Sequence, residues 1–391
     1  MIEFLFSDGE EICLYSEGCV KKQRSKFIEK YKQSILDTER AKSWKHSGEG
    51  AQFRGDVHYG ENGVNFASSI NGIYPLEDNS VAYSFTINST SGIYKAVLGD
   101  EKAPEIHIIN SVDYNFSGGC VDVGSNTLFC SLNRNMFNSD IAVFDLNTGD
   151  YKTVTEGDTL DCDPSVSPEN GNIIYFTSRG AGRDEQGNFI KYSAAAICRL
   201  NLSELTVEEI AVSDKLNYMK PIEFGGRLYA ITAPVKEKRP NPIIEILLIP
   251  FRIVQAIVNF INVFVTAFTG KSLASGGDNP AKGREYDSRK EYVKGNLINY
   301  ENELKKNKSK KDKDYGFIPQ SWKLVEVASG DVIKSGVADF DILQDGTFIV
   351  TNGRRIFAVK DGKTTKLCNT EKCLTVACVH RSQTKTDLFD F

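Results

Sequence analysis

Histidines, carboxylates and glycine-rich turns are residue types that commonly carry chemistry in a protein chain. The sequence has four histidines, His46, His58, His107 and His380. None has a second histidine three or four residues away, the spacing that places two imidazoles on one helix face for a metal. The sequence also lacks a serine-nucleophile elbow and a phosphate-binding loop pattern. It therefore favours a non-catalytic protein, and we expect neither a metal site nor a cofactor.

One group of charged residues remains as a candidate ligand-binding site: Asp161, Asp163, Arg179 and Arg183. They surround a single predicted pair of strands, and loops at the end of a sheet present such side chains to ligands. The alternative is that these residues brace turns or are solvated loop charges. The Gly-rich run at 117–120 opens a predicted strand and not a helix, so it is a weak phosphate candidate.

The composition is that of an ordinary folded protein, with 391 residues, 40% hydrophobic and 25% charged. This excludes a wholly disordered chain and a collagen-like or coiled-coil rod. The net charge of −5 gives no reason to expect a nucleic-acid partner. Nine cysteines without metal-type pairs argue against a disulfide framework and a zinc site. The N-terminus lacks the features of a signal peptide, so we expect a cytoplasmic location.

A strand–turn–strand pattern recurs along the chain. An apolar strand is followed by a turn with Asn or Gly and then by a second apolar strand, and the turns lie at Asn79, Asn126, Gly171, Gly226 and Gly346. The first three intervals match the period of a four-stranded propeller blade, which is roughly 40–50 residues. The last interval equals one period plus an insertion. This spacing predicts an all-β, propeller-type fold.

A further strand ending in a polar turn follows each copy, for example over 141–150 and 356–362. A sixth such strand lies at residues 11–18, close to the N-terminus, and its missing neighbour is available at 373–379. We therefore expect a six-bladed β-propeller closed by the N- and C-terminal strands. Closure removes the exposed sheet edges that an open array would leave.

One segment carries a family resemblance. Residues 161–179 contain Asp163-Pro164, Ser167-Pro168 and Gly171, followed by an apolar strand that ends in Ser178. This run resembles the TolB-type, WD-like propeller repeat, although Val166 stands at the aromatic position of that repeat and Glu-Asn replaces the Asp before Gly. The resemblance implies a propeller with turn-bracing roles for Asp163 and Ser167. It implies no activity, since such repeats serve binding proteins and peptidase accessory domains alike.

The fourth complete blade is interrupted by an insertion at 235–320, so that residues 1–234 and 321–391 form the predicted propeller. Within the insertion, residues 243–269 predict an amphipathic helix between a Pro-containing start and Gly270. Seven polar residues form one narrow stripe on it. The apolar face includes Phe251, Ile253, Phe260, Phe264 and Phe268.

Four environments compete for this helix. A membrane-spanning helix conflicts with the polar stripe and with the return of the chain to the same blade. A helix lying in the membrane interface agrees with both. Contact with a partner protein or with a second copy of the chain, and burial against the propeller itself, are the other two. Residues 271–314 carry twelve Lys or Arg and eight Asp or Glu; such a basic region attracts an anionic membrane surface, or else is a solvated linker.

A second basic segment, 21–45, places Phe27, Ile28, Tyr31, Ile35 and Leu36 on one helix face. It would lie on the same membrane surface or pack across one end of the propeller. Taken together, the sequence predicts a non-catalytic scaffold that binds a ligand, peptide or protein and is peripheral to the cytoplasmic membrane face. The alternative is a hydrolase or lyase that uses the central pocket.

Overall fold

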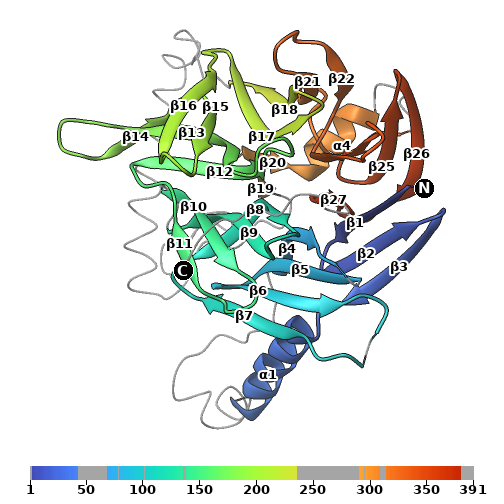
Figure 1. Cartoon of the computed structure of the whole chain (residues 1–391). Coiled ribbons are helices and arrows are strands. Elements are labelled where there is room, and N and C mark those ends of the chain that lie inside the picture. Colours follow the sequence, from blue (N-terminus) through green and yellow to red (C-terminus); the bar gives the residue numbers. More distant parts are fainter. Residues whose placement is uncertain are drawn as a thin grey trace, which may run out of the picture. The chain divides into compact units, whose positions relative to one another are not determined.

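The computed structural model describes residues 2–42, 68–77, 79–100, 102–134, 138–235, 290–294, 296–308 and 314–379. Strands dominate these residues, and two helices occur in them, α1 (Lys26–Lys42) and α4 (Tyr300–Lys308). The chain divides into two compact units, Met1–Pro234 with Tyr292–Phe391, and Val235–Glu291. The first unit holds antiparallel sheets arranged as the blades of a propeller (Figure 1).

Four sheets contain four strands each. One joins the two ends of the chain in the order β27 (Val376–Cys378), β1 (Glu3–Asp8), β2 (Glu11–Ser16) and β3 (Cys19–Arg24). The next consists of β4 (Ser68–Pro75), β5 (Ser80–Ile87), β6 (Thr90–Val97) and β7 (Ile106–Ser111). A third consists of β17 (Leu216–Phe224), β18 (Arg227–Pro234), β21 (Lys323–Glu326) and β22 (Val332–Ser335). The fourth consists of β23 (Asp339–Ile342), β24 (Phe348–Thr351), β25 (Arg355–Lys360) and β26 (Lys363–Asn369).

A nine-stranded sheet contains two consecutive strand sets. The first set is β8 (Asn115–Asp122), β9 (Thr127–Asn133), β10 (Ser139–Asp145) and β11 (Tyr151–Thr153). The second is β12 (Thr159–Val166), β13 (Ile173–Arg183), β14 (Phe189–Tyr192), β15 (Ala196–Asn201) and β16 (Thr206–Ala211). A single parallel residue pair, Ser139 with Leu160, links β10 to β12. The two sets are thus connected far more weakly than the strands within each set.

The predicted turns lie where the repeat places them, between the first and second strand of each set. Asn79, Asn126, Gly226 and Gly346 adopt left-handed backbone conformations with φ between 54° and 79°. Asn and Gly are the residues that tolerate this region best. The period read from the sequence is therefore confirmed, and its physical cause is the tight turn after each first strand.

The N-terminal strand pairs with the C-terminal strand, as predicted. In the antiparallel β1–β27 ladder, Phe4 lies opposite Cys378 and Phe6 opposite Val376. Asp8 strengthens this junction, because its Oδ1 accepts hydrogen bonds from the backbone N–H groups of Glu371 (2.8 Å) and Lys372 (2.9 Å). The two ends of the chain are consequently held in one sheet by both a ladder and a side-chain anchor.

The core consists of separate apolar clusters between neighbouring sheets. One cluster joins Phe4 and Phe6 of β1 to Ile349 and Ile356 of β24 and β25. Another joins β1 and β2 to β4, β5 and β6 around Tyr83 and Phe85. Burial of each large apolar side chain contributes about 1.5–3 kcal/mol. Face-to-face packing of successive sheets therefore supplies most of the stabilisation.

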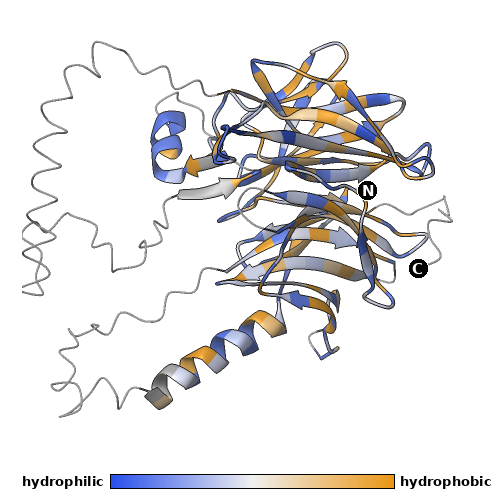
Figure 2. Ribbon diagram, turned by 90° about the vertical axis from the view of Figure 1, so that its left-hand side faces the viewer, coloured by the Kyte–Doolittle hydropathy of each residue, from blue (hydrophilic) through white to orange (hydrophobic). Residues whose placement is uncertain are grey.

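Helix α1 confirms a helix within the predicted segment 21–45, although residues 21–24 belong to strand β3. The N-terminal half of α1 packs on the second sheet. Ile28 is buried there, and Phe27 and Tyr31 contact the same cluster. Hydrophobic and hydrophilic segments alternate along the ribbon of this helix (Figure 2), as expected for an amphipathic helix. Ser25 caps the helix, since its Oγ accepts a hydrogen bond from the N–H of Ile28 at 3.2 Å. Glu105 accepts two more first-turn N–H groups, which suits the positive end of the helix dipole.

The end of the insertion forms a hairpin and a short helix. Strands β19 (Lys290–Val293) and β20 (Asn296–Asn299) pair with each other, and α4 follows directly. Within α4, the Asn307 amide donates hydrogen bonds to the carbonyl oxygens of Gly316 (2.8 Å) and Ile318 (2.9 Å). Part of the basic segment is therefore an ordered helix. The sequence reading missed this helix because lysines dominate the segment.

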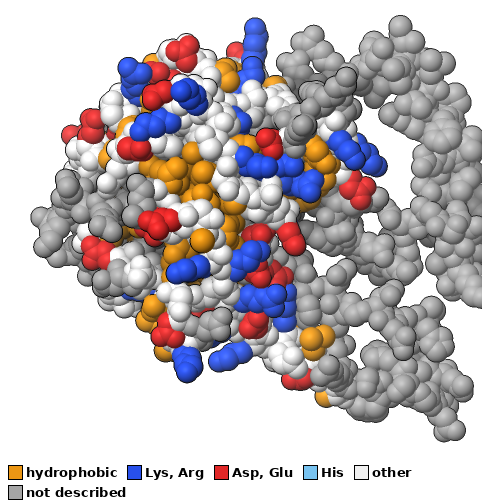
Figure 3. Space-filling view, turned by 90° about the vertical axis from the view of Figure 1, so that its right-hand side faces the viewer, with side chains coloured by type: hydrophobic (Ala, Val, Ile, Leu, Met, Phe, Trp, Pro, Cys, Tyr) orange, Lys and Arg blue, Asp and Glu red, His pale blue; other side chains and the backbone are white. Residues whose placement is uncertain are grey.

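The predicted helix 243–269 and its apolar face (Phe251, Ile253, Phe260, Phe264 and Phe268) lie outside the described residues. Among the residues that are described, neither helix is long and apolar enough to cross a membrane. On one face of the molecule, basic and acidic side chains are interspersed around apolar ones (Figure 3). Interspersed charge of this kind is typical of a solvated protein surface.

Replacement of Asp8 by Ala should destabilise the junction of the chain ends by about 1–3 kcal/mol, because two backbone N–H groups would lose their acceptor. Urea unfolding of the purified chain measures this change. Lys22→Ala is the matched control: it removes the half-exposed ammonium that also binds Asp8 but leaves both backbone bonds intact. Equal losses for the two variants would contradict an anchoring role for Asp8.

Candidate functional site

The candidate site is built on β-bulges in the first strands of four successive strand sets. Each of β4, β8, β12 and β17 has a register shift against its neighbour, at Ile70/Gly72, Ser117/Gly119, Cys162/Ser165 and Met219/Ile222. Three residues at these shifts adopt left-handed conformations: Gly118 (φ 56°), Asp163 (φ 53°) and Lys220 (φ 46°). A bulge of this kind re-aims a side chain out of the regular alternation of the strand. The first strands also contact one another, β8 with β12 and β12 with β17.

Four charged side chains meet there, and we call Asp163, Lys220, Lys294 and Asp339 the axial cluster. The ammonium of Lys294 lies 3.2 Å from Oδ1 of Asp163 and 3.1 Å from Oδ1 of Asp339. The ammonium of Lys220 lies 2.7 Å from Oδ2 of Asp339. Both carboxylates and both ammonium groups are largely buried, with side-chain exposures of 2–15%. The cluster thus joins β12, β17, β23 and the β19–β20 turn.

Asp339 is the centre of this arrangement. Its Oδ2 also accepts a hydrogen bond from the N–H of Val376 in β27, at 2.9 Å. Two residues further along β23, Oδ2 of Asp341 accepts a hydrogen bond from the N–H of Cys378 at 2.7 Å. The side chains of β23 therefore hold the C-terminal strand in place, in addition to the ladder that joins it to β1.

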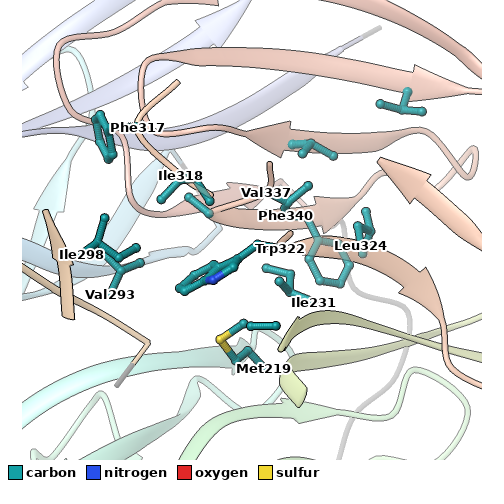
Figure 4. Close-up of a cluster of buried hydrophobic side chains, with 14 of the residues drawn as sticks. Met219, Ile231, Val293, Ile298, Phe317, Ile318, Trp322, Leu324, Val337 and Phe340 are labelled. Atoms are coloured by element: carbon teal, nitrogen blue, oxygen red, sulfur yellow. The ribbon is translucent and has the colours of Figure 1, made fainter. Parts of the chain in front are cut away.

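Apolar side chains on either side of Lys294 anchor the hairpin. Val293 and Ile298 are buried in a cluster with Met219, Phe317 and Trp322 (Figure 4). The turn is also held by Asn296, whose amide donates to the carbonyl oxygen of Lys294 at 2.9 Å. Lys294 itself has a left-handed φ of 46°. This geometry lets one residue of the turn point its ammonium at the two carboxylates while its neighbours face the core.

Space for the cluster depends on the glycine pair in β8. A Cβ on Gly118 would lie 2.6 Å from Oδ1 of Asp163, and a Cβ on Gly119 would lie 2.1 Å from the carbonyl oxygen of Phe129. Both positions also have positive φ. The Gly-rich run at 117–120 is thus explained by close packing beside Asp163, and the predicted strand at this position is confirmed.

The electrostatics of Lys294 are dominated by two opposing effects. Burial alone lowers its pKa, but the adjacent Asp163 and Asp339 more than offset this effect and raise the pKa above its usual value. Lys294 is accordingly a cation at every physiological pH.

The four residues that the sequence grouped have different partners in the structure. Asp163 belongs to the axial cluster and not to a turn. Asp161 is buried and accepts a hydrogen bond from Ser178 Oγ at 2.7 Å, and burial raises its pKa. Arg183 lies on the β13–β14 extension, where its guanidinium donates to Asp158 Oδ1 at 2.6 Å.

Arg179 lies on β13, opposite Leu160 of β12. Burial lowers the pKa of its guanidinium, and the charge of Asp163 acts in the opposite direction, so Arg179 is close enough to sense the axial cluster. Ser167 does brace its turn, because its Oγ accepts the N–H groups of Glu169 (3.3 Å) and Asn170 (3.2 Å).

Three members of the axial cluster, Lys220, Lys294 and Asp339, were missed by the sequence reading. One signal was present: Asp163-Pro164 and Lys220-Pro221 stand at equivalent places in successive repeats. Aligning the repeats on proline would have paired Asp163 with Lys220. No comparable signal marks Lys294, since its position depends on a hairpin inside the insertion.

Cysteines and His107 are further potentially reactive groups in the described part of the chain. Burial raises the pKa values of Cys120 and Cys162 to about 12, which leaves little thiolate at neutral pH. His107 is exposed on β7 and packs edge-on against Tyr94, with 5.2 Å between ring centroids. Within the described residues, no group of three or more His, Cys, Asp or Glu side chains is placed to hold a metal ion.

Comparisons with known proteins concern the fold alone. No protein-family model matches the chain, and no curated protein matches it. Among solved structures, TolB from Acinetobacter baumannii aligns at 12% identity with a TM-score of 0.46, over 96% of this chain and 65% of that protein. TolB from Agrobacterium tumefaciens aligns at 15% identity and a TM-score of 0.32, over 59% and 71%. The tricorn protease aligns at 12% identity and a TM-score of 0.37, over 96% and 39%.

Two TolB proteins are thus among the solved structures to which this chain is similar. The chain spans about two thirds of the length of the Acinetobacter TolB, at 65%. The propeller arrangement itself is defined by the strand pairings described above.

Replacement of Asp339 by Asn should destabilise the chain by about 3 kcal/mol or more, because Lys220 and Lys294 would lose their shared buried counter-charge. Equilibrium urea unfolding measures the loss. Asp345→Asn, in the same sheet, is the control: its partner Lys360 is half exposed, and such surface pairs contribute less than about 1 kcal/mol. A loss for Asp339→Asn no larger than for the control would show that the axial cluster is not a buried electrostatic unit.

Proposed function

We propose that the chain is a non-catalytic, six-bladed propeller scaffold that binds an extended segment of a partner protein along strand β16. The observation that carries this proposal is the exposure of β16, which is accessible on both faces over most of its length. Val207 and Ile210 on the strand, and Val212 just after it, are 52%, 42% and 62% exposed. Clustered exposed apolar side chains are typical of interaction sites.

The six-blade count is supported by the division of the nine-stranded sheet. Its two strand sets pack face to face through one apolar cluster, with Phe129 and Val143 on one side and Phe176 and Leu200 on the other. Ring closure is supported by contacts between successive first strands, β27 with β4, β4 with β8, β8 with β12, β12 with β17, β17 with β23 and β23 with β27. Each of these contacts is expected between neighbouring blades of a closed ring.

The backbone of β16 is available for strand addition. One edge of β16 pairs with β15, and the other pairs with no described strand. The outermost strands β3 and β26 carry lysines, such as Lys21, Lys22 and Lys363, and edge lysines discourage pairing with another chain. Strand β16 has none. An extended peptide can add to such an edge through main-chain hydrogen bonds.

The charges around β16 select the partner. Residues 204–214 contain four acidic side chains, Glu204, Glu208, Glu209 and Asp214, and no basic one. Arg199 on β15 neutralises only Glu208, at 2.6 Å. We therefore infer that the partner segment alternates apolar with basic residues, so that its apolar side chains meet Val207 and its cations meet the carboxylates.

A peptide of alternating valine and lysine should bind the chain at least about tenfold more tightly than one of alternating valine and glutamate, a difference of about 1.4 kcal/mol. Fluorescence anisotropy of labelled peptides measures both affinities. Val207→Lys should remove the preference by placing a cation on the edge. Val332→Lys on the exposed strand β22 is the control and should change nothing. Equal affinity for both peptides would refute the β16 proposal.

The membrane role remains part of the proposal. Support comes from the sequence of residues 243–269, with its apolar face and polar stripe, and from the basic residues that follow it. An amphipathic helix of this type would hold the propeller at the cytoplasmic membrane face while β16 is occupied.

Deletion of residues 240–270 should release the chain from anionic vesicles in a flotation assay, because the apolar face supplies the attachment. Phe251→Ser with Phe260→Ser and Phe264→Ser should have the same effect. Asn259→Ala with Asn262→Ala alters the polar stripe instead and should leave flotation unchanged. If the deletion variant floats like the full chain, attachment through this helix is excluded.

A further inference from the structure

In the axial cluster, the ammonium of Lys294 lies between the carboxylates of Asp163 and Asp339 as a bound cation would. Oδ2 of Asp339 is satisfied by the Lys220 ammonium at 2.7 Å and by the Val376 N–H at 2.9 Å. Its Oδ1 accepts no hydrogen bond from the described residues of the blades and is paired with the Lys294 ammonium at 3.1 Å. Asp339 is only 1% exposed. One buried oxygen is thus reserved for a cation that the blades themselves do not provide.

The second carboxylate is positioned independently of the hairpin. The N–H of Asp163 donates to Ser131 Oγ at 3.0 Å, and its bulged conformation is fixed within β12. Gly118 leaves the space that its carboxylate needs. Both acceptors are therefore preorganised by the blades, which lowers the cost of binding a cation between them.

The hairpin that supplies the ammonium is separable from the blades. Strand β19 pairs with β20, and neither pairs with any described strand of another sheet. Lys294 occupies a left-handed conformation, which is unfavourable for a residue with a side chain such as lysine. The hairpin is instead retained by side chains, through the burial of Val293 and Ile298 beside Trp322. Withdrawal of the hairpin would break apolar contacts but no interstrand ladder of a blade.

We propose that the centre of the propeller is a binding site for a primary ammonium group, that Lys294 occupies it in cis, and that a lysine side chain of a peptide is the ligand class that competes with it. This site uses different residues from β16, so either proposal can fail without the other. A primary ammonium has three donors, which match the separate carboxylates of Asp163 and Asp339. A trimethylated ammonium has no donor, and an acetylated lysine has no charge.

The tethered Lys294 acts as a competitor of high effective concentration, so it weakens the apparent affinity for a free ligand. Lys294→Ala should therefore bind Nα-acetyl-lysine amide at least about tenfold more tightly than the parent chain, as measured by isothermal titration calorimetry. Lys294→Ala combined with Asp339→Asn should lose this gain. Nα-acetyl-norleucine amide and the trimethyl-lysine analogue should not bind. Lys360→Ala, which removes a surface lysine, should behave like the parent chain.

A second measurement follows the hairpin in the parent chain. The sequence has two tryptophans, Trp44 and Trp322, so Trp44→Phe leaves only the one beside Val293. Lysine-amide titration should shift the emission of Trp322 to longer wavelength as the hairpin leaves, and the norleucine amide should not. Equal binding by the parent and Lys294→Ala, or retention of binding when Asp339→Asn is added, would overturn the proposal.

If Lys294→Ala does not fold, Lys294→Gln takes its place in the titration. Should both fail, refolding is compared in propylammonium chloride and in sodium chloride at equal ionic strength. Recovery of folded Lys294→Ala in propylammonium alone would support an ammonium site. Equal recovery in the two salts, or recovery in neither, would overturn it.

Discussion

The carboxylate of Asp339 is the interaction on which the centre of the molecule depends. It lies on β23 and contacts Lys220 of β17, Lys294 of the β19–β20 turn and the backbone of Val376 in β27. These elements are far apart in the sequence, and no apolar cluster contains all of them. A single buried anion therefore fixes the relative position of the C-terminal strand, one neighbouring sheet and the end of the insertion.

Placing charges at the centre has an energetic cost that apolar packing would avoid. Desolvation of two carboxylates and two ammonium groups offsets much of their attraction, so such a set contributes less to stability than its short distances suggest. The charged set instead adds directional contacts that fix the geometry of the groups it joins. The apolar clusters between sheets tolerate small shifts, whereas an ammonium held 3.1–3.2 Å from two carboxylates tolerates only one placement of the hairpin. The axial cluster thus specifies how the hairpin is placed, and the apolar packing between sheets supplies most of the stability of the fold.

The strand–turn period was readable from the sequence because each left-handed turn demands Asn or Gly, as at Asn79 and Gly346. The pairing of the chain ends followed from counting strands, and helix α1 followed from its apolar face. The centre was not readable in the same way. Asp163 was a candidate ligand-binding residue, with a turn-bracing role implied by the repeat resemblance; its contact with Lys294 was not predicted, since a bulge that re-aims a side chain leaves no periodic signal. Lys294 owes its role entirely to tertiary placement.

Because β1 pairs with the three-residue strand β27, the first sheet stays incomplete for much of the time that the chain is being synthesised. Strand β1 leaves the ribosome long before its partner β27 is synthesised, because the rest of the described sheets lies between them in the sequence. At about 5–20 residues per second, β1 waits roughly 20–70 s for that partner. During this interval one edge of the first sheet is open, together with the acceptor oxygens of Asp8 that later bind Glu371 and Lys372. Chaperone contact with the nascent chain is most valuable in this period.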